Sequence, residues 1–381
     1  MAAQAPLRMA MVGGGPGAFI GPVHRMAAEL DGRFRLVAGS FSRDASRNAE
    51  AGRMWGVRED RIYADYHQMI HAEAARPDGA QLVAVVTSND THYSISAAAL
   101  DAGLHVMSDK PATLNLAEAR ALAGKVAASG KVYGLTYIYT GYPMAREARE
   151  IVRRGDLGAI RKVVVEYAQG WLSRPIERDG DRQAGWRADP AQAGVGGCIG
   201  DIGVHAFNMA EFVSGLRVER LCADLSSMVP GRVLDDDCNM LLRFAGGARG
   251  VLIASQISAG ARNGMTIKVY GEKGGLCWSH ERPGELALDL LDAPSQILHA
   301  ASGYLSAPAR ARVRIPTGHP EGFIEAFANL YADLADAIAE GRTDPAPLPG
   351  IADGVRGMAF VERAVAASRD GEGWVSLEAA P

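Results

Sequence analysis

The sequence has few of the features that mark several large classes of protein. Its four cysteines, at 198, 222, 238 and 277, are scattered and form no CxxC pair. This spacing offers neither a disulfide framework nor a zinc site, so we expect no bound metal and a reducing, cytoplasmic setting. No apolar run approaches the ~18 residues of a membrane helix, and the first residues lack the apolar core of a signal peptide.

Blocks of like charge are also missing. The chain carries 40 Lys and Arg against 44 Asp and Glu, a net charge of −4, with the two signs interspersed. Nucleic-acid binding requires a basic face, so we expect neither a nucleic-acid nor a membrane partner. The sequence does have a hydrophobic content of 48% over 381 residues, which is typical of a globular protein with two domains.

The first third of the chain alternates between strand and helix patterns. Strand patterns occupy residues 9–12, 34–41, 81–86, 104–107 and 132–137, and helical patterns separate them. Consecutive parallel strands need helical crossovers, so this alternation predicts an α/β domain with a doubly wound parallel sheet of the Rossmann type. We assign it to residues 1–136 and expect it to bind a dinucleotide.

The rest of the chain has a different rhythm. Longer strand patterns at residues 160–168, 218–226, 237–244, 248–255 and 265–270 are joined by short turns or lack regular helices between them. Helical patterns cover residues 144–153, 204–213, 321–339 and 351–368. This predicts an α+β domain with a large, mostly antiparallel sheet over residues 137–381, serving substrate binding and oligomerisation.

A glycine loop follows the first strand. The strand ends in Gly13, Gly14 and Gly15, and a helical pattern opens near Gly21. Such a loop lets the backbone approach a pyrophosphate, whose charge is held by free N–H groups and the helix dipole. The spacing is irregular, and an ordinary glycine-rich turn is the alternative. The residues expected to contact a dinucleotide here are Gly13, Gly15, Ala18, Phe19 and Ile20.

Polar residues follow the later strands of this domain at the carboxyl edge, where open α/β sheets bind ligands. The further cofactor-binding candidates are Thr87, Ser88, Asn89, His92, Asp109 and Lys110. Partial burial would lower the pKa of Lys110 and suit it to proton handling. The alternatives are helix capping by Asn89 or Asp90 and a solvated lysine.

Ser42 and Arg43 end the second strand, where the type of cofactor is selected. An acidic residue there bonds the ribose 2′-hydroxyl of NAD, whereas a hydroxyl and an arginine suit the 2′-phosphate of NADP. Ser42 and Arg43 favour NADP, Asp44 keeps NAD open, and Ser42 could instead be a helix N-cap. The cofactor is therefore expected to be NAD or NADP.

Asp201 and His205 form the most informative pair in the second part of the chain. They are four residues apart on what should be the first turn of a helix, so both side chains can face one cleft. A histidine exchanges a proton with a substrate hydroxyl at neutral pH, and a carboxylate one turn away can orient it. Taken alone, such a pair more often caps and packs a helix.

Together these passages resemble the Gfo/Idh/MocA family, the glucose-fructose oxidoreductase and inositol dehydrogenase-like enzymes, over nearly the whole chain. Residues 13–24 resemble the family's opening fingerprint with a short insertion, and residues 87–92 its threonine-proline-asparagine turn, with Ser88 in place of proline. Residues 109–111 resemble its glutamate-lysine-proline motif, with Asp109 in place of glutamate. Residues 186–205 resemble its tryptophan-arginine, glycine-rich, aspartate and histidine motif.

The resemblance implies an NAD(P)-dependent dehydrogenase that acts on a sugar, sugar derivative or polyol. Lys110, Asp201 and His205 would be the catalytic group: His205 as general base, Lys110 polarising the substrate oxygen, and Asp201 orienting His205 or binding a neighbouring hydroxyl. Weaker candidates for substrate contact are Tyr137, Trp171, Arg187 and His319. Family members are typically dimers or tetramers, so a homodimer or homotetramer is expected.

Two other functions stay open on the sequence. The first is an oxidoreductive glycoside hydrolase, resembling a branch of the same family in which a hydride is removed and later returned, so that NAD is recycled. Lys110, His205 and a nearby tyrosine, Tyr137 or Tyr139, could serve either this chemistry or that of a dehydrogenase. The second is a non-enzymatic dinucleotide sensor, which the complete set of Lys110, Asp201 and His205 disfavours.

Overall fold

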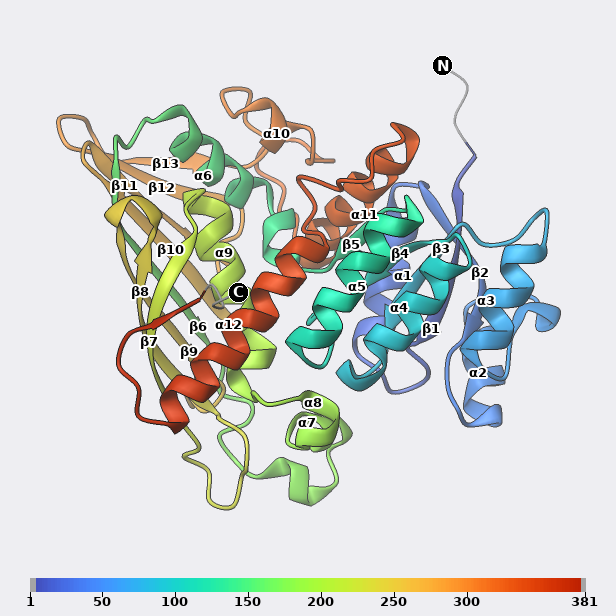
Figure 1. Cartoon of the computed structure of the whole chain (residues 1–381). Helices are drawn as coiled ribbons and strands as arrows, with labels where there is room; N and C mark the ends of the chain where they lie inside the picture. Colours follow the sequence, from blue (N-terminus) through green and yellow to red (C-terminus); the bar gives the residue numbers. More distant parts are fainter. Residues whose placement is uncertain (1–4, 378–381) are drawn as a thin grey trace. The chain divides into compact units, whose positions relative to one another are not determined.

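The computed structural model describes residues 5–377, which fold into two compact units. One unit joins the N-terminal part of the chain, through Ile138, to Phe323–Val355, and the other joins Tyr139–Gly322 to the part from Arg356 onward (Figure 1). The sequence predicted one boundary, after residue 136, and two contiguous domains. Each unit is instead built from two segments, because a C-terminal helix packs on the first unit.

The first unit contains a parallel sheet of five strands in the order β2-β1-β3-β4-β5. The strands are β1 Leu7–Gly13, β2 Phe34–Ser40, β3 Leu82–Val86, β4 His105–Ser108 and β5 Tyr133–Leu135. All five residues of β3 are buried, as expected for a central parallel strand covered on both faces. The predicted doubly wound parallel sheet is confirmed.

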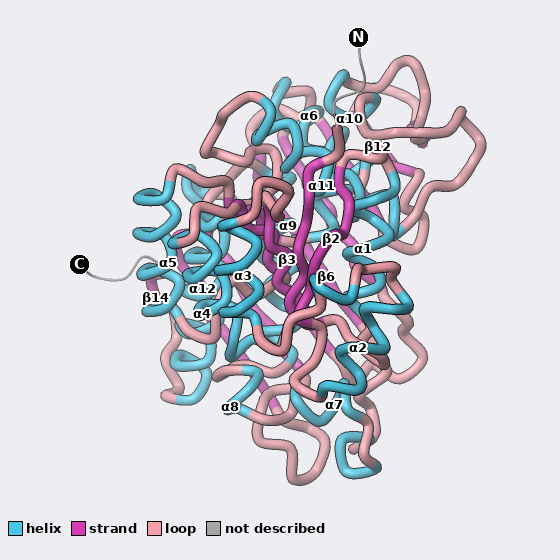
Figure 2. The backbone as a smooth tube through the Cα atoms, turned by 90° about the vertical axis from the view of Figure 1, so that its right-hand side faces the viewer, coloured by secondary structure: helices cyan, strands magenta, loops and turns pink. Residues whose placement is uncertain are grey.

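Helices form the crossovers between these strands. They are α1 Ile20–Leu30, α2 Ala45–Met54, α3 Tyr66–Ala75, α4 His92–Asp101 and α5 Leu116–Ser129. Side-chain caps fix where three of them begin, because Asp44, Asp65 and Asn115 each accept a hydrogen bond from an N–H in the first turn of α2, α3 or α5. Figure 2 shows the strands of this sheet flanked by these helices.

Helix α11, Phe323–Ala339, belongs to the first unit because it packs along α1. His24 of α1 is fully buried, its Nδ1 lies 2.8 Å from the Tyr331 hydroxyl, and its ring meets that of Phe327 edge-on at 4.7 Å between centroids. At the rim, Arg33 pairs with Asp336 at 2.9 Å. The sequence placed this helix in the second domain, since a periodic apolar stripe shows which face is buried but not its partner.

The second unit contains a sheet of nine strands in the order β13-β12-β11-β10-β6-β9-β8-β7-β14. The strands are β6 Ile160–Ala168, β7 Val218–Ser226, β8 Asp237–Phe244, β9 Arg249–Ser255, β10 Gly264–Gly271, β11 Gly274–Ser279, β12 Glu285–Leu290, β13 Gln296–His299 and β14 Val375–Ser376. Neighbouring strands run antiparallel except β6 and β9, which are parallel. The predicted large, mostly antiparallel sheet is confirmed.

Helices α6, Pro143–Arg154, and α9, Val204–Ser214, pack on each other and against this sheet (Figure 1). Ten residues of α9 are buried, because the helix is apolar nearly all round. The remaining helices are the short α7 Arg182–Arg187, α8 Pro190–Ala193 and α10 Ala307–Arg310, and the long α12 Ile351–Arg369, which begins in the first unit and continues in the second.

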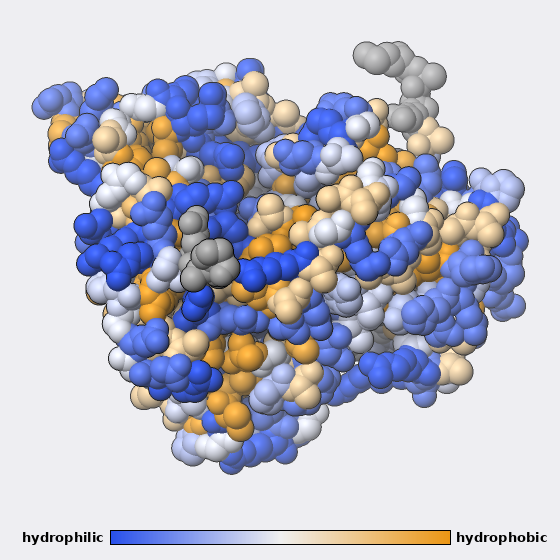
Figure 3. Space-filling view, viewed as in Figure 1, coloured by the Kyte–Doolittle hydropathy of each residue, from blue (hydrophilic) through white to orange (hydrophobic). Residues whose placement is uncertain are grey.

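The surface carries charges of both signs. Figure 3 shows hydrophilic side chains over much of the viewed face, interrupted by smaller apolar patches. In the described part of the chain, no helix combines the length and the apolar character that crossing a bilayer requires.

The buried His24 predicts how stability depends on pH. Burial lowers the pKa of His24 from 6.5 to about 4, so between these values the unfolded chain binds a proton that the folded chain does not. The stabilisation is therefore complete above pH 6.5 and is lost as the pH falls toward 4. We expect about 3 kcal/mol of unfolding free energy to be lost over this window.

Urea titrations at several pH values measure this, with His24→Gln as the comparison. The variant should show a shallower loss of stability with falling pH than the wild type. His105, whose pKa burial also lowers to about 4, is present in both proteins and contributes equally. Equal pH dependence in the two proteins would contradict the assignment to His24.

Candidate functional site

The glycine loop runs in close backbone contact with the ends of β2 and β3. Gly13 and Gly14 have φ values of 88° and 75°, a region that side-chain-bearing residues rarely adopt. A Cβ on Gly13 would lie 2.7 Å from the carbonyl oxygen of Val86, and a Cβ on Gly15 would lie 2.7 Å from that of Phe41. Larger residues would therefore push the loop off the sheet.

The helix after this loop also approaches closely. A Cβ on Gly21 would lie 2.3 Å from the Cα of Gly14, so only glycine allows α1 to begin here. The helix begins at Ile20, just before the predicted start, and its N-cap Phe19 makes no side-chain capping bond. The cradle of backbone atoms and the positive end of α1 fit the pyrophosphate of a dinucleotide.

The residue that caps α2, just after the end of β2, is not the one suggested by the sequence. Asp44, not Ser42, is the N-cap of α2: its carboxylate accepts from the Arg47 N–H at 2.9 Å, while the Ser42 Oγ accepts from the Asp44 N–H at 3.1 Å. The interpretation of Ser42 as a cap is therefore wrong. One oxygen of the Asp44 carboxylate caps α2, and both Asp44 and Arg43 are exposed.

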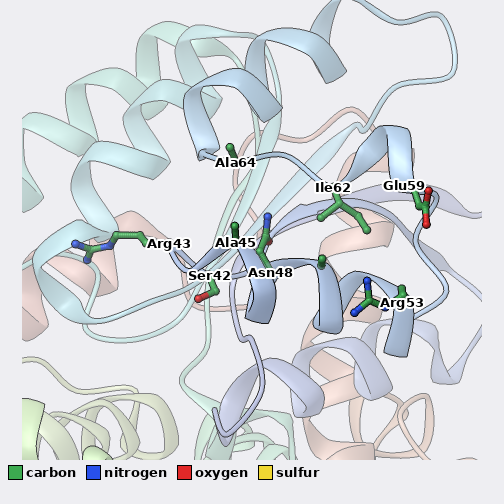
Figure 4. Close-up of a pocket in the computed structure, with 9 residues that line it drawn as sticks. Ser42, Arg43, Ala45, Asn48, Arg53, Glu59, Ile62 and Ala64 are labelled. Carbon is green, nitrogen blue, oxygen red and sulfur yellow. The ribbon is translucent and has the colours of Figure 1, made fainter.

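A cavity of about 320 Å³ opens beside Ser42 and Arg43, along α2. Its lining residues are Ser42, Arg43, Ala45, Asn48, Ala49, Arg53, Glu59, Ile62 and Ala64. Figure 4 shows Arg43 extending away from the others, with Arg53 and Glu59 at the opposite end. The cavity thus adjoins the position that a cofactor ribose is expected to reach.

The turns after β3 and β4 are tied together by His92. Its Nε2 lies 3.1 Å from the carbonyl oxygen of Thr87, and its Nδ1 lies 2.7 Å from that of Pro111. His92 is almost fully buried, so it fixes the backbone on either side of the expected nicotinamide position. The N-cap of α4 is Thr91, so neither Asn89 nor Asp90 caps that helix.

Lys110 follows β4 and is half-buried. Asp109 before it accepts hydrogen bonds from the Thr136 hydroxyl at 2.5 Å and from the Lys110 N–H at 2.9 Å. The backbone at Lys110 is thus fixed from both sides, by Asp109 and by the carbonyl that His92 binds.

In the second unit, Asp201 lies in a π-helical turn, Ile199–Gly203, which continues into α9 with His205 in its first turn. The sequence predicted an ordinary helical turn here. Single π-turns are rare in helices, and those that occur often lie at functional sites. The Asp201 Oδ2 accepts from the Arg187 Nε at 3.0 Å and from the Gln256 Nε2 at 2.8 Å.

His205 lies among aromatic rings. It is 6% exposed, and the Tyr139 ring stands perpendicular to it at 5.2 Å between centroids. The hydroxyls of Tyr139 and Tyr167 are 2.5 Å apart. Burial, followed by the neighbouring phenol, raises the pKa of Tyr139 well above 10, so its hydroxyl stays protonated at neutral pH.

Amides extend this polar cluster. Asn263 Oδ1 accepts from the Tyr167 hydroxyl at 2.6 Å and from Gln169 Nε2 at 2.8 Å, and Gln169 Oε1 accepts from Trp171 Nε1 at 2.9 Å. The sequence reasoning missed Tyr167, Gln169, Asn263 and Gln256. A signal for two of them exists, since Gln169 and Gln256 follow the parallel strands β6 and β9, whose carboxyl ends meet.

The structure groups some of the weaker candidates with this cluster. The Arg187 guanidinium lies 5.8 Å from the centroid of Trp171, and it bonds Asp201. Tyr137 is buried in the first unit after β5, and His319 is exposed with its Nδ1 near the Pro316 carbonyl of its own turn. Within residues 5–377, no group of three or more His, Cys, Asp or Glu could hold a metal ion.

Comparison with known families assigns both parts of the chain. A model described as "Oxidoreductase family, NAD-binding Rossmann fold" matches residues 7–137, and one for the GFO/IDH/MocA C-terminal domain matches residues 145–277. The protein is therefore an NAD-binding oxidoreductase. More particularly, the chain belongs to the GFO/IDH/MocA family, which confirms the resemblance.

Several relatives match over nearly the whole chain. An uncharacterised oxidoreductase of Bacillus subtilis, YfiI, is 35% identical over 98% of this chain and 97% of its own. Levoglucosan dehydrogenase of Pseudarthrobacter phenanthrenivorans is 26% identical over 97% and 98%. The crystal structure of an inositol dehydrogenase homolog from Azotobacter vinelandii, complexed with NAD+, is 39% identical over 98% of both chains, with a TM-score of 0.94.

The contact between Gly14 and Gly21 is testable. We expect Gly21→Ala to lower the free energy of unfolding by about 1–3 kcal/mol, because the added methyl overlaps the Gly14 backbone. NADH affinity should fall as well, since α1 is displaced from the loop. Urea denaturation and NADH fluorescence titration measure the two effects.

Gly124→Ala in α5 is the matched control. Beyond the neighbouring backbone of its own helix, no atom lies within 4 Å of a Cβ placed there, so alanine should stabilise the protein by about 0.5–1 kcal/mol through helix propensity. Equal effects of the two substitutions would contradict the packing argument.

Proposed function

We propose that this oxidoreductase is a dehydrogenase of a sugar, sugar derivative or polyol. The observation that carries the proposal is the cluster that begins at His205, in which two phenol rings lie against a nearly buried imidazole and hydrogen bonds lead on from the phenols through two amides to the Trp171 indole. Hydroxyl-rich ligands need several donors and acceptors together with an apolar face. The inositol and levoglucosan dehydrogenases among the relatives support this class.

Each catalytic candidate has a distinct task in this scheme. His205 accepts the proton of the reacting hydroxyl, since an imidazole exchanges protons in the neutral range. Asp201, held by Arg187 and Gln256, binds the neighbouring substrate hydroxyl or orients His205. Lys110 polarises the reacting oxygen from its fixed turn. A nicotinamide, when bound, would supply the hydride acceptor as the alcohol carbon becomes a carbonyl.

The substrate side of the scheme rests on the second unit. Trp171 is 37% exposed and can cover the apolar face of a sugar ring, while Gln169 and Asn263 can bond its hydroxyls. Tyr137 and His319 stay predictions for substrate contact.

For the cofactor we propose NAD, with NADP as the alternative. The family model describes an NAD-binding fold, and the Azotobacter vinelandii relative was crystallised with NAD+. The glycine loop, with Gly13, Gly15, Ala18, Phe19 and Ile20, would hold the pyrophosphate, and Ser42 would meet the ribose. Thr87, Ser88 and Asn89 would line the path toward the nicotinamide.

An oxidoreductive glycoside hydrolase is the second candidate. The specific observation for it is the Tyr139 ring against His205 at 5.2 Å, which places a protonated phenol beside the proposed base. Such a phenol keeps its proton and could donate a hydrogen bond to a leaving group. This chemistry releases an aglycone without net accumulation of reduced cofactor.

We also propose that the protein works as a homodimer or homotetramer in the cytoplasm. The four cysteines are free thiols in the structure, and apolar side chains such as Leu241, 50% exposed on β8, lie on the outer face of the large sheet. Light scattering on the purified protein measures the assembly state.

A substrate panel tests the proposed function. Inositols, sugars and glycosides are incubated with NAD or NADP, and reduced nicotinamide is followed by absorbance with product analysis by mass spectrometry. We expect oxidation of at least one polyol or sugar coupled to stoichiometric reduction of NAD. Aglycone release at catalytic NAD would support the hydrolase, and no turnover in any arm would sink both.

The catalytic assignment predicts separable effects of substitution. Lys110→Met and His205→Ala should each lower kcat by about 100-fold or more while NADH affinity is retained, since each removes a group acting on the proton or the oxygen. Lys125→Met and His71→Ala change the same residue types on the surface of the first unit and should leave turnover unchanged. Wild-type turnover in either catalytic variant would refute its role.

The proposed contact of Arg43 with the 2′-phosphate can be tested by substitution. Arg43→Ala should lower kcat/KM with NADP by about 10-fold, because a charge-assisted contact to the 2′-phosphate is lost, and should leave the value with NAD nearly unchanged. Steady-state kinetics with both cofactors measure the ratio. An equal loss with both cofactors would mean that Arg43 does not read the phosphate.

A further inference from the structure

The turn that carries Asp201 is anchored from a distant part of the chain. The Asp235 carboxylate accepts hydrogen bonds from the Gly197 N–H and the Ile199 N–H, one on each oxygen and both at 2.7 Å. The N–H of Cys198 between them donates to the Asp235 carbonyl oxygen at 2.8 Å. Three successive N–H groups at the start of the π-turn therefore end on one residue.

The fit between these two segments is close. A Cβ on Gly197 would lie 2.2 Å from the carbonyl oxygen of Asp235, so glycine is required for the contact. The Gly197 carbonyl oxygen in turn accepts from the Asp201 N–H at 2.9 Å. The path from the Asp235 carboxylate to the Asp201 backbone is thus two hydrogen bonds long.

A second path reaches the Asp201 side chain. The carbonyl oxygen of Asp236 accepts from the Gln256 N–H at 3.0 Å, and the Gln256 side chain donates to Asp201 Oδ2 at 2.8 Å. The same two-residue segment therefore holds Asp201 through its backbone and through its carboxylate.

We propose that Asp235 is a positioning residue for catalysis, whose carboxylate fixes the turn that presents Asp201 and His205 to the substrate. The inference rests on the proposed function of that pair. Bonds from a carboxylate to N–H groups at a helix start are charge-assisted, short and directional. A displacement of about 1 Å in a catalytic group can cost about 100-fold in rate.

Removing the Asp235 carboxylate from water costs free energy that a carboxylate on the surface does not lose. Burial raises the pKa of Asp235 to about 6, although the bonds from Ile199 and Gly197 favour the ionised form. The turn thus keeps a carboxylate where an amide or hydroxyl would be easier to bury.

Asp236 and Asp237, which follow Asp235 in the chain, make different contacts. Substitutions at Arg232, the partner of Asp236, and at Asp237 therefore serve as comparisons for Asp235. The Asp236 carboxylate accepts from Arg232 Nη1 at 3.0 Å, and the same Nη1 donates to the carbonyl oxygen of Leu172 at 3.0 Å, next to Trp171. Arg232 therefore joins the segment of Asp235 and Asp236 to the substrate-side segment and does not itself bond the catalytic turn. The Asp237 carboxylate bonds the nearby Asn239 side chain, at 2.7 Å.

The experiment compares Asp235→Asn, Arg232→Met and Asp237→Asn in the full-length protein. Asp235→Asn should lower kcat by about 10- to 100-fold with little change in KM or NADH affinity. The asparagine side chain has one acceptor oxygen where aspartate has two. The backbone amide of Gly197 or of Ile199 therefore loses its acceptor and should exchange hydrogen faster. Arg232→Met should mainly raise KM, and Asp237→Asn should behave as wild type.

A second variant guards against simple unfolding. Asp235→Glu keeps the charge but shifts the carboxylate by one methylene, so it should lower kcat with a smaller loss of stability than Asp235→Asn. If both Asp235 variants fold and keep wild-type kcat and amide exchange, the proposal is overturned. If Arg232→Met lowers kcat in the same way as Asp235→Asn, a general loosening explains the effect and the positioning role is likewise overturned.

Failure of the proposed function gives a different result. If the wild-type protein oxidises nothing in the substrate panel, the dehydrogenase assignment falls, but amide exchange at Gly197 and Ile199 still decides whether Asp235 fixes the turn. Unchanged exchange in Asp235→Asn overturns the positioning role on its own.

Discussion

The arrangement of the polar cluster in the second unit depends on the hydrogen bonds that the Asp201 carboxylate accepts. One of its oxygens receives the Arg187 guanidinium from α7 and the Gln256 amide from the end of β9. Both are separated from Asp201 in sequence, and all three come together only when the sheet and the π-turn are formed. A carboxylate taken out of water needs such partners, so the site and the local fold stabilise each other.

The first unit depends on a different constraint, which is backbone contact without side chains. Gly14 and Gly21 meet so closely that neither tolerates a Cβ, and Gly13 and Gly15 lie against the carbonyl oxygens that end β3 and follow β2. Polar chemistry there is left to N–H groups and the dipole of α1, which suits a phosphate of either cofactor. We propose that selectivity between the two cofactors is left to Ser42 and Arg43, outside the loop.

The sequence was sufficient for the class of fold, and it proposed Asp201 and His205 as a pair, which stays a prediction. Alternating strand and helix patterns predict the parallel sheet, because parallel strands need helical crossovers. The spacing of Asp201 and His205 is visible in the sequence because the two residues are only four apart. Contacts between distant segments were not accessible in the same way. The periodicity of residues 321–339 does not reveal α1 as its partner, and nothing local marks Asp235 or Asn263 as neighbours of one cluster.

In the proposed function, a hydride passes from a hydroxyl-bearing carbon to NAD while the chain's own groups handle the proton. The most direct measurement uses a polyol or sugar substrate from the panel, deuterated at the reacting carbon, and locates the label by mass spectrometry and NMR. Direct hydride transfer predicts deuterium on the reduced nicotinamide in an amount equal to the carbonyl product. Product formed with the label still on its carbon, or none on the nicotinamide, would contradict it.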